Sequence, residues 1–583
     1  MAYRRVPLDA FVEEFSATTE LSSVALGGRV LSVSDEFFAE AYQLLLVEPA
    51  ASLKGQFGPN GALYSGWESR RHNITHDWCI IRLGTSGSIS GFDIDTSHFN
   101  GNEAPHVSVD IFSGPASEEP KTVDSKWVEV LPKVPLDPNS RHLFRIPSTD
   151  GATFVKLTMY PDGGLARFRV YGHVSPVHPK DSAEVFDLAH VFAGGRVEFT
   201  SDQHFGVGSN LILPGRGKDM GDGWETKRSR EKGHKDWVII KLGAPGALEQ
   251  VEIDTAHFKG NFPESCEVHA LFVTGDVDWS GTKGEGHEWS LILPRTKLGP
   301  HRQHYFQLEN VEGKLFTHVK ITIHPDGGLK RVRIIGTKGP ASTCPPTTKS
   351  QGEPADTPSS ALDAGAVYVP VLPLTPEAFA PFGQVIQAYG EHNAAPKGTK
   401  ITPANQGSAS KFHKLSLLTS SYPEGADATA GMSVYRCSPL QDISSDGSAD
   451  VTVMERHPFT NQAFIPMGKG ASEGLADPGC AYLVVVAKNA TENRPDVTTV
   501  RAFVAHASQG IVYDTAVWRE CVDRIICAGT LRFRTDQPMT VLGKAMDFAC
   551  VETQIGDGSS ADCEIVELER VVRLRLPKDY ARN

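Results

Sequence analysis

The sequence predicts a mostly β protein: two tandem jelly-roll β-sandwiches of similar size, followed by a third β-rich domain. Three observations support this prediction. Long segments of the first 340 residues occur twice, their apolar residues alternate with polar ones, and Gly, Pro and Asp stand between the alternating runs. Because the side chains of a strand point alternately to opposite faces, such short runs separated by turn residues are typical of antiparallel strands.

The duplication is visible in three pairs of segments. GGRV at 27–30 returns at 194–197, GWESRRHNITHDWCIIRLG returns as GWETKRSREKGHKDWVIIKLG, and VKLTMYPDGGLARFRVYG returns as VKITIHPDGGLKRVRIIG. The offset stays between 157 and 167 residues. A repeat of this length is too long for one unit of a solenoid, so each copy should be a domain. We place copy one at 10–175 and copy two at 180–337.

After the second copy the composition changes. Residues 338–366 are rich in Pro, Ser and Thr and poor in large apolar residues, so they should form a flexible tether. From 367 to 575 we expect another β-rich domain, because AYLVVVAK at 481–488 and TTVRAFVA at 498–505 have the pattern of strands. LTPEAFAPFG at 374–383 predicts a short capped helix.

Charge and composition exclude several classes of protein. The net charge is −13 and no long cluster of Lys and Arg occurs, so binding to nucleic acid has no electrostatic support. No apolar run approaches the length of a membrane span, and the N-terminal MAYRRVPLDAFVEEF lacks the apolar core of a secretory signal. Nine scattered cysteines without a CxxC pair fit reduced thiols. We therefore expect a soluble, cytoplasmic protein that binds neither nucleic acid nor a membrane.

A polar motif follows the same predicted strand in both copies, as DIDTSHFNGN and as EIDTAHFKGN. Asp95 precedes His98 by three residues, and Asp254 precedes His257 by three, so Asp and His can meet only if the chain turns between them. The FNGN and FKGN that follow predict such a turn. The pair could then be a general acid and base or part of a metal site; alternatively, the Asp caps the turn and the His packs under the rim.

Together, GWESRR, HDW, DIDTSHFNGN and PDGGLARFRVYG, each duplicated, resemble the allantoicase family, over about residues 10–337. The resemblance implies two jelly-roll, galactose-binding-like repeats that hydrolyse allantoate to ureidoglycolate and urea, with a site between or beside the repeats. Release of urea requires a proton for a poor nitrogen leaving group while the substrate carboxylate is held in place.

The chemistry of allantoate selects the candidate residues. An Arg fork suits a carboxylate, Asp or Glu accepts hydrogen bonds from ureido N–H groups, and His can shuttle a proton. The predicted catalytic residues are Asp95, His98, Asp254 and His257. The predicted substrate-binding residues are Glu68, Arg71, Asn102, Glu225 and Asn261. The sequence leaves open which copy is catalytic.

The C-terminal segment resembles a second family, ureidoglycolate lyase. VLPLTPEAFAPFGQVI, VYRCSP, MERHPFTNQAFIPM, RAFVAHASQGIVYDTAVW and DFACVE carry this resemblance over about residues 368–570. It implies a cupin-like β-barrel that cleaves ureidoglycolate to glyoxylate and urea. Its substrate is the product of the first enzyme, so each resemblance strengthens the other.

The lyase chemistry needs a base for the hydroxyl proton of ureidoglycolate and a cation for its carboxylate. Glu455 and His457 alternate onto one strand face and suit a polar barrel interior, although a surface pair is the alternative. Gln462 can hydrogen-bond urea, and Arg436 can hold the carboxylate. We predict neither a metal nor a cofactor, because no HxH with a downstream His is found.

The lyase pattern is interrupted after Trp518. The family continues VW-H-x-P, whereas this chain reads VWRECVDRIICAGTLRFRTDQPM, so the expected His is missing and about 17 residues are extra. Residues 519–536 are either an inserted loop or the product of a retained intron. Codons for residues 519–521 can contain the splice donor GTGAGT and those for 535–536 the acceptor ACAG. Excision would keep the frame and restore a His after Trp518.

We therefore predict a bifunctional, homo-oligomeric enzyme that converts allantoate through ureidoglycolate to glyoxylate and two molecules of urea. If residues 519–536 are translated, we expect a weak or inactive lyase domain. Two alternatives remain open: tandem β-sandwich modules that bind a carbohydrate or another polar ligand beside a non-catalytic cupin, and an allantoicase with an inactive C-terminal domain. Fold alone does not decide among them, because function resides in sites.

Overall fold

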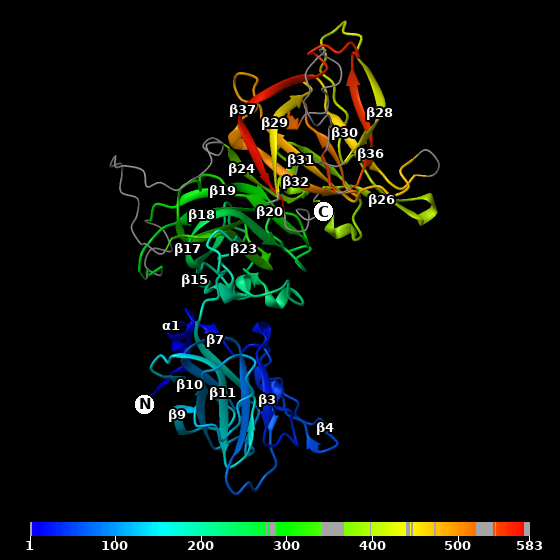
Figure 1. The fold of residues 1–583 in the computed structure, drawn as a ribbon. Helices are drawn as coiled ribbons and strands as arrows, with labels where there is room; N and C mark the ends of the chain where they lie inside the picture. Colours follow the sequence, from blue (N-terminus) through cyan, green and yellow to red (C-terminus); the bar gives the residue numbers. More distant parts are fainter. Residues whose placement is uncertain are drawn as a thin grey trace, which may run out of the picture. The chain divides into compact units, whose positions relative to one another are not determined.

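The structure, a computed structural model, describes residues 3–275, 277–279, 287–340, 366–396, 398–438, 444, 447–470, 474–520, 540–542 and 544–576. Residues 341–365 of the predicted tether and residues 521–536 of the predicted insert lie outside the described residues. Figure 1 shows β-strands throughout both repeats and the C-terminal domain, and the prediction of a mostly β fold is confirmed.

The first repeat is built on one long strand, β7 (Asp77–Asp95). Its first half pairs with β3 and β11, and its second half pairs with β10 and β13, so a single strand joins two sets of neighbours. The sheet order is β1-β10-β7-β11-β8-β9, with β2, β3 and β13 beside this path. The other strands of this sheet are β1 (Arg4–Val6), β2 (Thr19–Glu20), β3 (Arg29–Val33), β8 (His106–Phe112), β9 (Val128–Pro135), β10 (Arg141–Arg145), β11 (Gly151–Tyr160) and β13 (Arg167–Val174).

The second repeat has the same plan. Its long strand β17 (Asp236–Asp254) contains 19 residues, as β7 does, and pairs with β15, β20 and β21. The sheet order is β14-β23-β17-β21-β18-β19. The other strands of this sheet are β14 (Phe186–Asp187), β15 (Arg196–Thr200), β18 (Ser265–Leu271), β19 (Ser290–Lys297), β20 (Gln303–Gln307), β21 (Phe316–His324) and β23 (Arg331–Lys338).

Each repeat also has a two-stranded sheet that holds the GWE segment against the PDGG turn. In copy one, β6 (Trp67–Glu68) pairs with β12 (Gly164–Leu165). In copy two, β16 (Trp224–Glu225) pairs with β22 (Gly328–Leu329). Segments about 100 residues apart in sequence are thereby brought together at one end of each sandwich.

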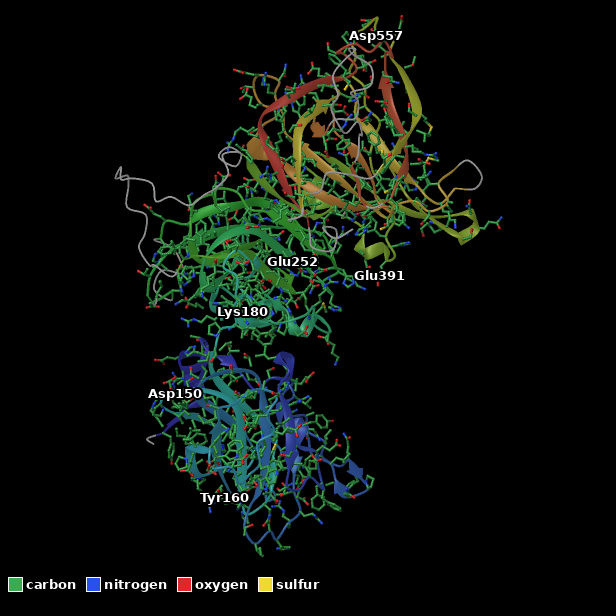
Figure 2. All side chains as sticks on the ribbon, in the orientation of Figure 1. Asp150, Tyr160, Lys180, Glu252, Glu391 and Asp557 are labelled. Carbon is green, nitrogen blue, oxygen red and sulfur yellow. The ribbon has the colours of Figure 1, made fainter. Side chains whose placement is uncertain are left out.

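Strand alternation places the core of the first repeat. Phe92 and Ile94 of β7 are fully buried in the apolar core, whereas Asp93 and Asp95 belong to the opposite face of the same strand. Side chains fill the sandwich along β11, and Asp150 and Tyr160 lie near the two ends of this strand in Figure 2.

The C-terminal domain combines a closed six-stranded barrel with a separate five-stranded sheet. The barrel order is β24-β37-β29-β34-β31-β32, and it closes because β32 also pairs with β24. The barrel strands are β24 (Val367–Pro373), β29 (Ser448–Arg456), β31 (Ala481–Ala487), β32 (Arg501–His506), β34 (Trp518–Glu520) and β37 (Glu564–Arg575), with β35 (Thr540–Leu542) added beside β31. The second sheet, in order, contains β25 (Gly383–Ile386), β33 (Gly510–Tyr513), β30 (Gln462–Met467), β36 (Met546–Gln554) and β28 (Thr429–Cys437).

The two faces of the barrel wall pack into different cores. One core contains Leu483, Val485 and Trp518 and draws residues from all six barrel strands, as the interior of a closed barrel must. The alternate residues Tyr482 and Val484 pack outward against the five-stranded sheet. The barrel interior is therefore apolar, and a second core lies between the barrel wall and the sheet.

The predicted short helix is α2 (Pro376–Phe379). Thr375 caps it by accepting a hydrogen bond from the backbone N–H of Ala378 at 3.3 Å, and Pro376 occupies the first turn. The other α-helix is α1 (Phe11–Phe15). None of the helices that the structure describes is both long and apolar enough to cross a membrane.

Trp67 should be a major stabilising residue of the first repeat, because it is fully buried and its indole N–H donates to the carbonyl oxygen of Asp35 at 2.8 Å. Trp67→Ala should lower the free energy of unfolding by about 3–5 kcal/mol, measured by pulse proteolysis in urea. Ile74→Ala is the control, because Ile74 is 97% exposed. Equal stability of the two variants would contradict the placement of Trp67 in the core.

The half-buried Glu198 should make the second repeat sensitive to acid. Its carboxylate accepts hydrogen bonds from Trp279 at 2.8 Å and Arg196 at 3.0 Å, and Nε2 of His318 lies 3.2 Å away. Burial raises the pKa of Glu198, but these hydrogen bonds and the charge of Arg196 outweigh it and lower the pKa from 4.5 to about 2. Hence the unfolded chain binds a proton at pH values where the folded repeat does not.

The stability that Glu198 contributes is therefore present above its ordinary pKa of 4.5 and is lost as the pH falls through about 2. Glu198→Gln should flatten the dependence of the unfolding free energy on pH in this window. Glu231→Gln, at an exposed position, is the control and should keep the wild-type dependence. An unchanged acid profile in the Glu198 variant would refute this role of the carboxylate.

Candidate active sites

The repeated polar motif forms a turn at the end of β7 and of β17. The two strands end at Asp95 and Asp254, whose carboxylates each accept a hydrogen bond at 2.8 Å from the backbone N–H two residues on. His98 and His257 then have φ angles of 69° and 68°. The chain turns between Asp and His, as predicted, and both Asp side chains cap the turn.

The two His side chains contact other segments. The exposed His98 ring has Nε2 3.1 Å from the carbonyl oxygen of Ala50. The backbone N–H of His257 donates to Nδ1 of His301 at 2.8 Å, and the two rings meet edge to face. Among the residues described in copy one, no hydrogen bond joins Asp95 to His98. The catalytic roles of these Asp and His residues stay predictions.

Four side chains of copy one converge at the two-stranded sheet, and we call them the copy-one cluster: Glu68, Arg71, Asn102 and Asp162. Asn102 donates through Nδ2 to Oε1 of Glu68 at 3.0 Å, and Nη2 of Arg71 lies 3.9 Å from the same oxygen. Nη1 of Arg71 donates to Oδ1 of Asp162 at 3.1 Å. The GWESRR, NGN and PDGG motifs, which are far apart in sequence, thus supply one polar group.

The copy-one cluster places the Arg71 guanidinium beside the Glu68 carboxyl group, whose pKa is raised. Burial raises the pKa of Glu68 above its usual range, although the hydrogen bond from Asn102 and the charge of Arg71 act in the opposite direction. The Arg71 side chain as a whole remains 33% exposed, whereas its Nη2 is buried and makes no hydrogen bond to any residue that the structure describes. The cluster can therefore hold an anion and exchange a proton close to it.

Copy two repeats the Arg–Asp part of this cluster. Nη1 of Arg228 donates to Oδ1 of Asp326 at 3.0 Å, as Arg71 does to Asp162. In both copies the Asp also accepts a hydrogen bond at 2.9 Å from a backbone N–H close after the Arg, that of Asn73 in copy one and that of Ser229 in copy two. Glu225 at the end of GWE is half-buried.

The predicted site residue Asn261 of copy two is also half-buried. Three residues of these clusters were not predicted from the sequence: Asp162, Arg228 and Asp326. They belong to the duplicated GWE and PDGG segments, and this duplication could have indicated them.

The face of β7 that carries Asp95 is charged, and Asp93 and Asp95 are both buried on it. Register places Arg141 and Arg167 opposite Asp95 on its two neighbouring strands. Arg167 is 3% exposed and donates to the carbonyl oxygens of Glu48 and Ser65. Because these hydrogen bonds fasten the N-terminal segments of the repeat over the sheet, Arg167 has a structural role.

The C-terminal domain has a polar cluster between its barrel wall and its five-stranded sheet; we call Glu455, His457, Gln462, Arg519 and Glu552 the inter-sheet cluster. Glu455 and Arg519 face each other across β29 and β34, with Nε of Arg519 3.2 Å from Oε1 of Glu455. Nη2 of Arg519 donates to Oε1 of Gln462. Nδ1 of His457 lies 3.5 Å from Oε2 of Glu552. Glu455, His457 and Gln462 thus lie close together. We predicted that they would line a polar barrel interior, but the barrel interior is apolar and these residues lie outside it.

The charges of the inter-sheet cluster shift one another's acidity. Burial, followed by the charge of Arg519, lowers the pKa of His457 well below 6.5, so this imidazole is neutral near pH 7. Burial raises the pKa of Glu552 despite the nearby Arg519 and Gln462. A neutral imidazole beside a carboxyl group whose pKa is raised is a suitable arrangement for proton transfer.

Arg436 does not belong to the inter-sheet cluster. It pairs with Asp547 on the neighbouring strand at 2.8 and 2.9 Å, and its side chain is 54% exposed. The cluster's own cation, Arg519, was not among the predicted site residues, and neither was Glu552. Glu552 ends the DFACVE motif, and side chains two residues apart on a strand share a face, so Glu552 lies on the same face as the buried Cys550. This pattern could have indicated Glu552.

One group in the described part of the chain has the composition of a metal site. Ligand atoms of Glu455, His457 and Cys563 all lie within 4.8 Å of one another. The guanidinium of Arg519 beside Glu455 opposes a second positive charge there. The sequence predicted no metal, and this prediction is not tested.

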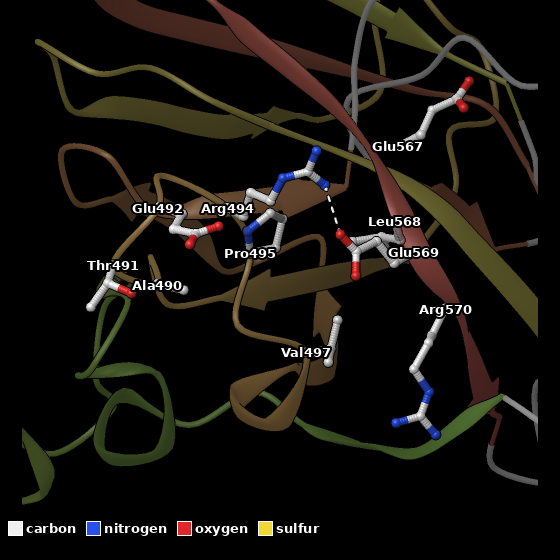
Figure 3. A pocket seen from close by; sticks show the side chains of 10 residues that line it. All are labelled: Ala490, Thr491, Glu492, Arg494, Pro495, Val497, Glu567, Leu568, Glu569 and Arg570. Atoms are coloured by element: carbon white, nitrogen blue, oxygen red, sulfur yellow. Dashed lines mark hydrogen bonds and ion pairs between the residues drawn. The ribbon is translucent and has the colours of Figure 1, made fainter.

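A surface pocket of about 310 Å³ lies elsewhere on the C-terminal domain, between the loop of residues 490–497 and β37. Figure 3 shows Arg494 paired with Glu569 across it, with Nη1 of the former 3.3 Å from Oε1 of the latter. None of its lining residues belongs to the inter-sheet cluster, so we do not place a candidate active site in this pocket.

Comparison with known proteins matches two families to separate segments of the chain. The Allantoicase repeat family matches residues 19–175 and 186–339, and the Ureidoglycolate lyase family matches residues 366–529. A protein of Schizosaccharomyces pombe named "Probable allantoicase" is 48% identical over 335 residues, which cover 56% of this chain and 94% of that protein. The allantoicase of Saccharomyces cerevisiae is 45% identical over 321 residues, covering 53% of this chain and 91% of that protein.

A solved structure of similar fold supports the same assignment. The crystal structure of allantoicase from Saccharomyces cerevisiae matches with a TM-score of 0.51 and 39% identity, covering 57% of this chain and 100% of that chain. The resemblance of both segments to their families is thereby confirmed. This chain belongs to the allantoicase family, and a ureidoglycolate lyase domain follows its two allantoicase repeats.

Proposed function

We propose that the repeats hydrolyse allantoate to ureidoglycolate and urea, and that the C-terminal domain is a ureidoglycolate lyase domain, whose cleavage of ureidoglycolate to glyoxylate and urea is weak or lost while residues 519–536 are present. The first activity is supported by relatives at 45% and 48% identity whose names include allantoicase. The second rests on the lyase family match and on the inter-sheet cluster. Cytoplasmic localisation, homo-oligomerisation and the domain boundaries given above stay predictions.

The copy-one cluster is the observation that supports the hydrolase assignment most directly. Arg71, with an Nη2 group that makes no hydrogen bond within the described structure, would hold the allantoate carboxylate. Glu68 and Asn102 would bind the ureido groups through their oxygen atoms. Because burial favours the protonated form of Glu68, this carboxyl group can give its proton to the departing urea nitrogen, and the carboxylate so formed can take up a proton from the water that adds to the carbon.

The inter-sheet cluster supports the lyase assignment. Cleavage needs a group that takes the hydroxyl proton of ureidoglycolate while urea leaves. The neutral His457 is able to accept that proton, and Glu552 is placed 3.5 Å from it. One observation favours the second candidate, an allantoicase with an inactive lyase domain: Arg519 lies inside the cluster and forms an ion pair with Glu455.

Copy one should carry the hydrolase site. Glu68→Gln keeps the size and the hydrogen bond to Asn102 but removes the exchangeable proton, so the rate of urea release from allantoate should fall by about 10²-fold or more. Glu225→Gln is the matched variant of copy two and should retain most of the activity. The opposite result, with loss only in the Glu225 variant, would move the site to copy two.

The two activities should be separable with allantoate as the substrate. The full chain should release urea, while enzyme-dependent glyoxylate should stay near that of a heat-inactivated control, because Arg519 takes the place of the expected His. Replacement of residues 519–536 by a single His should restore glyoxylate release. Glyoxylate formed as fast as urea by the unmodified chain would show that the lyase domain tolerates the extra segment.

The retained-intron hypothesis has a direct measurement. Transcripts that lack the codons for residues 519–536 should be found beside those that contain them. If every transcript contains them, the segment is an ordinary part of the protein and the hypothesis is wrong.

A further inference from the structure

The guanidinium of Arg519 is enclosed by polar and aromatic side chains of the C-terminal domain. The residue is 2% exposed, and register with Glu455 on β29 and Val486 on β31 directs its side chain out of the barrel toward the five-stranded sheet. The neighbouring Trp518 points to the other face, where its indole donates to Asn489. The buried arginine therefore meets groups that come from three other strands.

These groups form a slot for a flat molecule that donates hydrogen bonds. Oε1 of Glu455 lies 3.2 Å from Nε, and Oε1 of Gln462 accepts a hydrogen bond from Nη2. Cζ of Arg519 lies over the ring of Tyr513, 4.8 Å from the ring centroid. Two acceptors at the edge and an aromatic ring over the face select planar N–H donors.

A ureido group has the same shape and the same donors as a guanidinium. Both consist of a trigonal carbon bonded to nitrogen atoms that carry hydrogen, and in both all heavy atoms lie in one plane. A ureido group differs in replacing one nitrogen by an oxygen and in being neutral. A ureido substrate could therefore use Oε1 of Gln462, which accepts a hydrogen bond from Arg519, and Oε1 of Glu455, which forms an ion pair with Arg519 and accepts no hydrogen bond within the described structure.

We propose that Glu455, Gln462 and Tyr513 form the ureido-binding subsite of the lyase domain, and that the guanidinium of Arg519 occupies this subsite in the present chain. This inference rests on the proposed lyase function, which it deepens by naming the substrate group bound. A ureido ligand can enter only when the arginine leaves, so the apparent affinity is reduced by the fraction of chains in which the subsite is open.

Removal of the side chain should open the subsite. In the full chain, Arg519→Ala should bind N-methylurea at least about tenfold more tightly than the unmodified chain, measured by isothermal titration calorimetry. Methylguanidinium should also bind, because it restores the ion pair with Glu455. Methylammonium, a cation without a planar group of N–H donors, should not bind.

Arg456→Ala is the matched control. This arginine is also buried in the C-terminal domain, but it pairs with Glu564 and lies over Trp518 instead of in the inter-sheet cluster. The control chain keeps both allantoicase repeats, so any binding of N-methylurea to the repeats appears in both variants. The difference between the two variants reports the subsite.

A second variant keeps the test decisive if an unpaired Glu455 prevents folding. Arg519→Ala combined with Glu455→Gln leaves no uncompensated charge, so it should fold. It should bind N-methylurea, because Gln also offers an acceptor, but should lose methylguanidinium, because the carboxylate is gone. The proposal is overturned if neither variant binds N-methylurea more tightly than the Arg456 control, or if methylammonium binds Arg519→Ala as well as methylguanidinium does.

These binding measurements are independent of turnover. If Arg519→Ala binds N-methylurea but no lyase variant forms glyoxylate, the subsite stands and the proposed lyase activity fails. If replacement of residues 519–536 by His restores glyoxylate release while Arg519→Ala binds no ureido compound, the lyase activity stands and the subsite fails.

Discussion

The buried candidate side chains of this protein are subject to one constraint: a charge placed between two packed layers must find a partner there. Strands alternate their side chains, so a strand covered on both faces buries its polar set as well as its apolar set. In the repeats this brings Asp95 beside Arg141 and Arg167. In the C-terminal domain it brings Glu455 beside Arg519.

The same constraint separates structural charges from candidate catalytic ones. The buried Arg167 side chain donates to carbonyl groups of covering segments. Arg71, by contrast, keeps Asp162 as a partner but remains partly exposed, with a second nitrogen directed toward Glu68. A cation that is fixed by one partner and keeps a second nitrogen without a hydrogen bond can bind an anion without loss of its own position.

Duplication explains why the two repeats share their framework. The Arg–Asp pair beside the two-stranded sheet is present in both copies, at Arg71 and Asp162 and at Arg228 and Asp326. Both pairs also bind a backbone N–H, so they stabilise the turn whether or not a substrate is present. A function can thus be lost from one copy while the fold of that copy is retained.

The local features of this protein were determined by sequence alone, because they depend on neighbours in the chain. Alternation and turn residues predicted the strands and both repeats, and Thr375 and Pro376 predicted the helix that follows β24. The turn after Asp95 was predicted as well, because an Asp can cap the next residues wherever the strand ends. Only the tertiary structure decided which side chains meet. It directed Arg436 toward Asp547 on the exposed face of one sheet, and it enclosed Arg519 with Gln462 between two sheets. These pairings join strands that lie far apart in the chain, so their partners depend on sheet order and register, which single-sequence patterns do not contain.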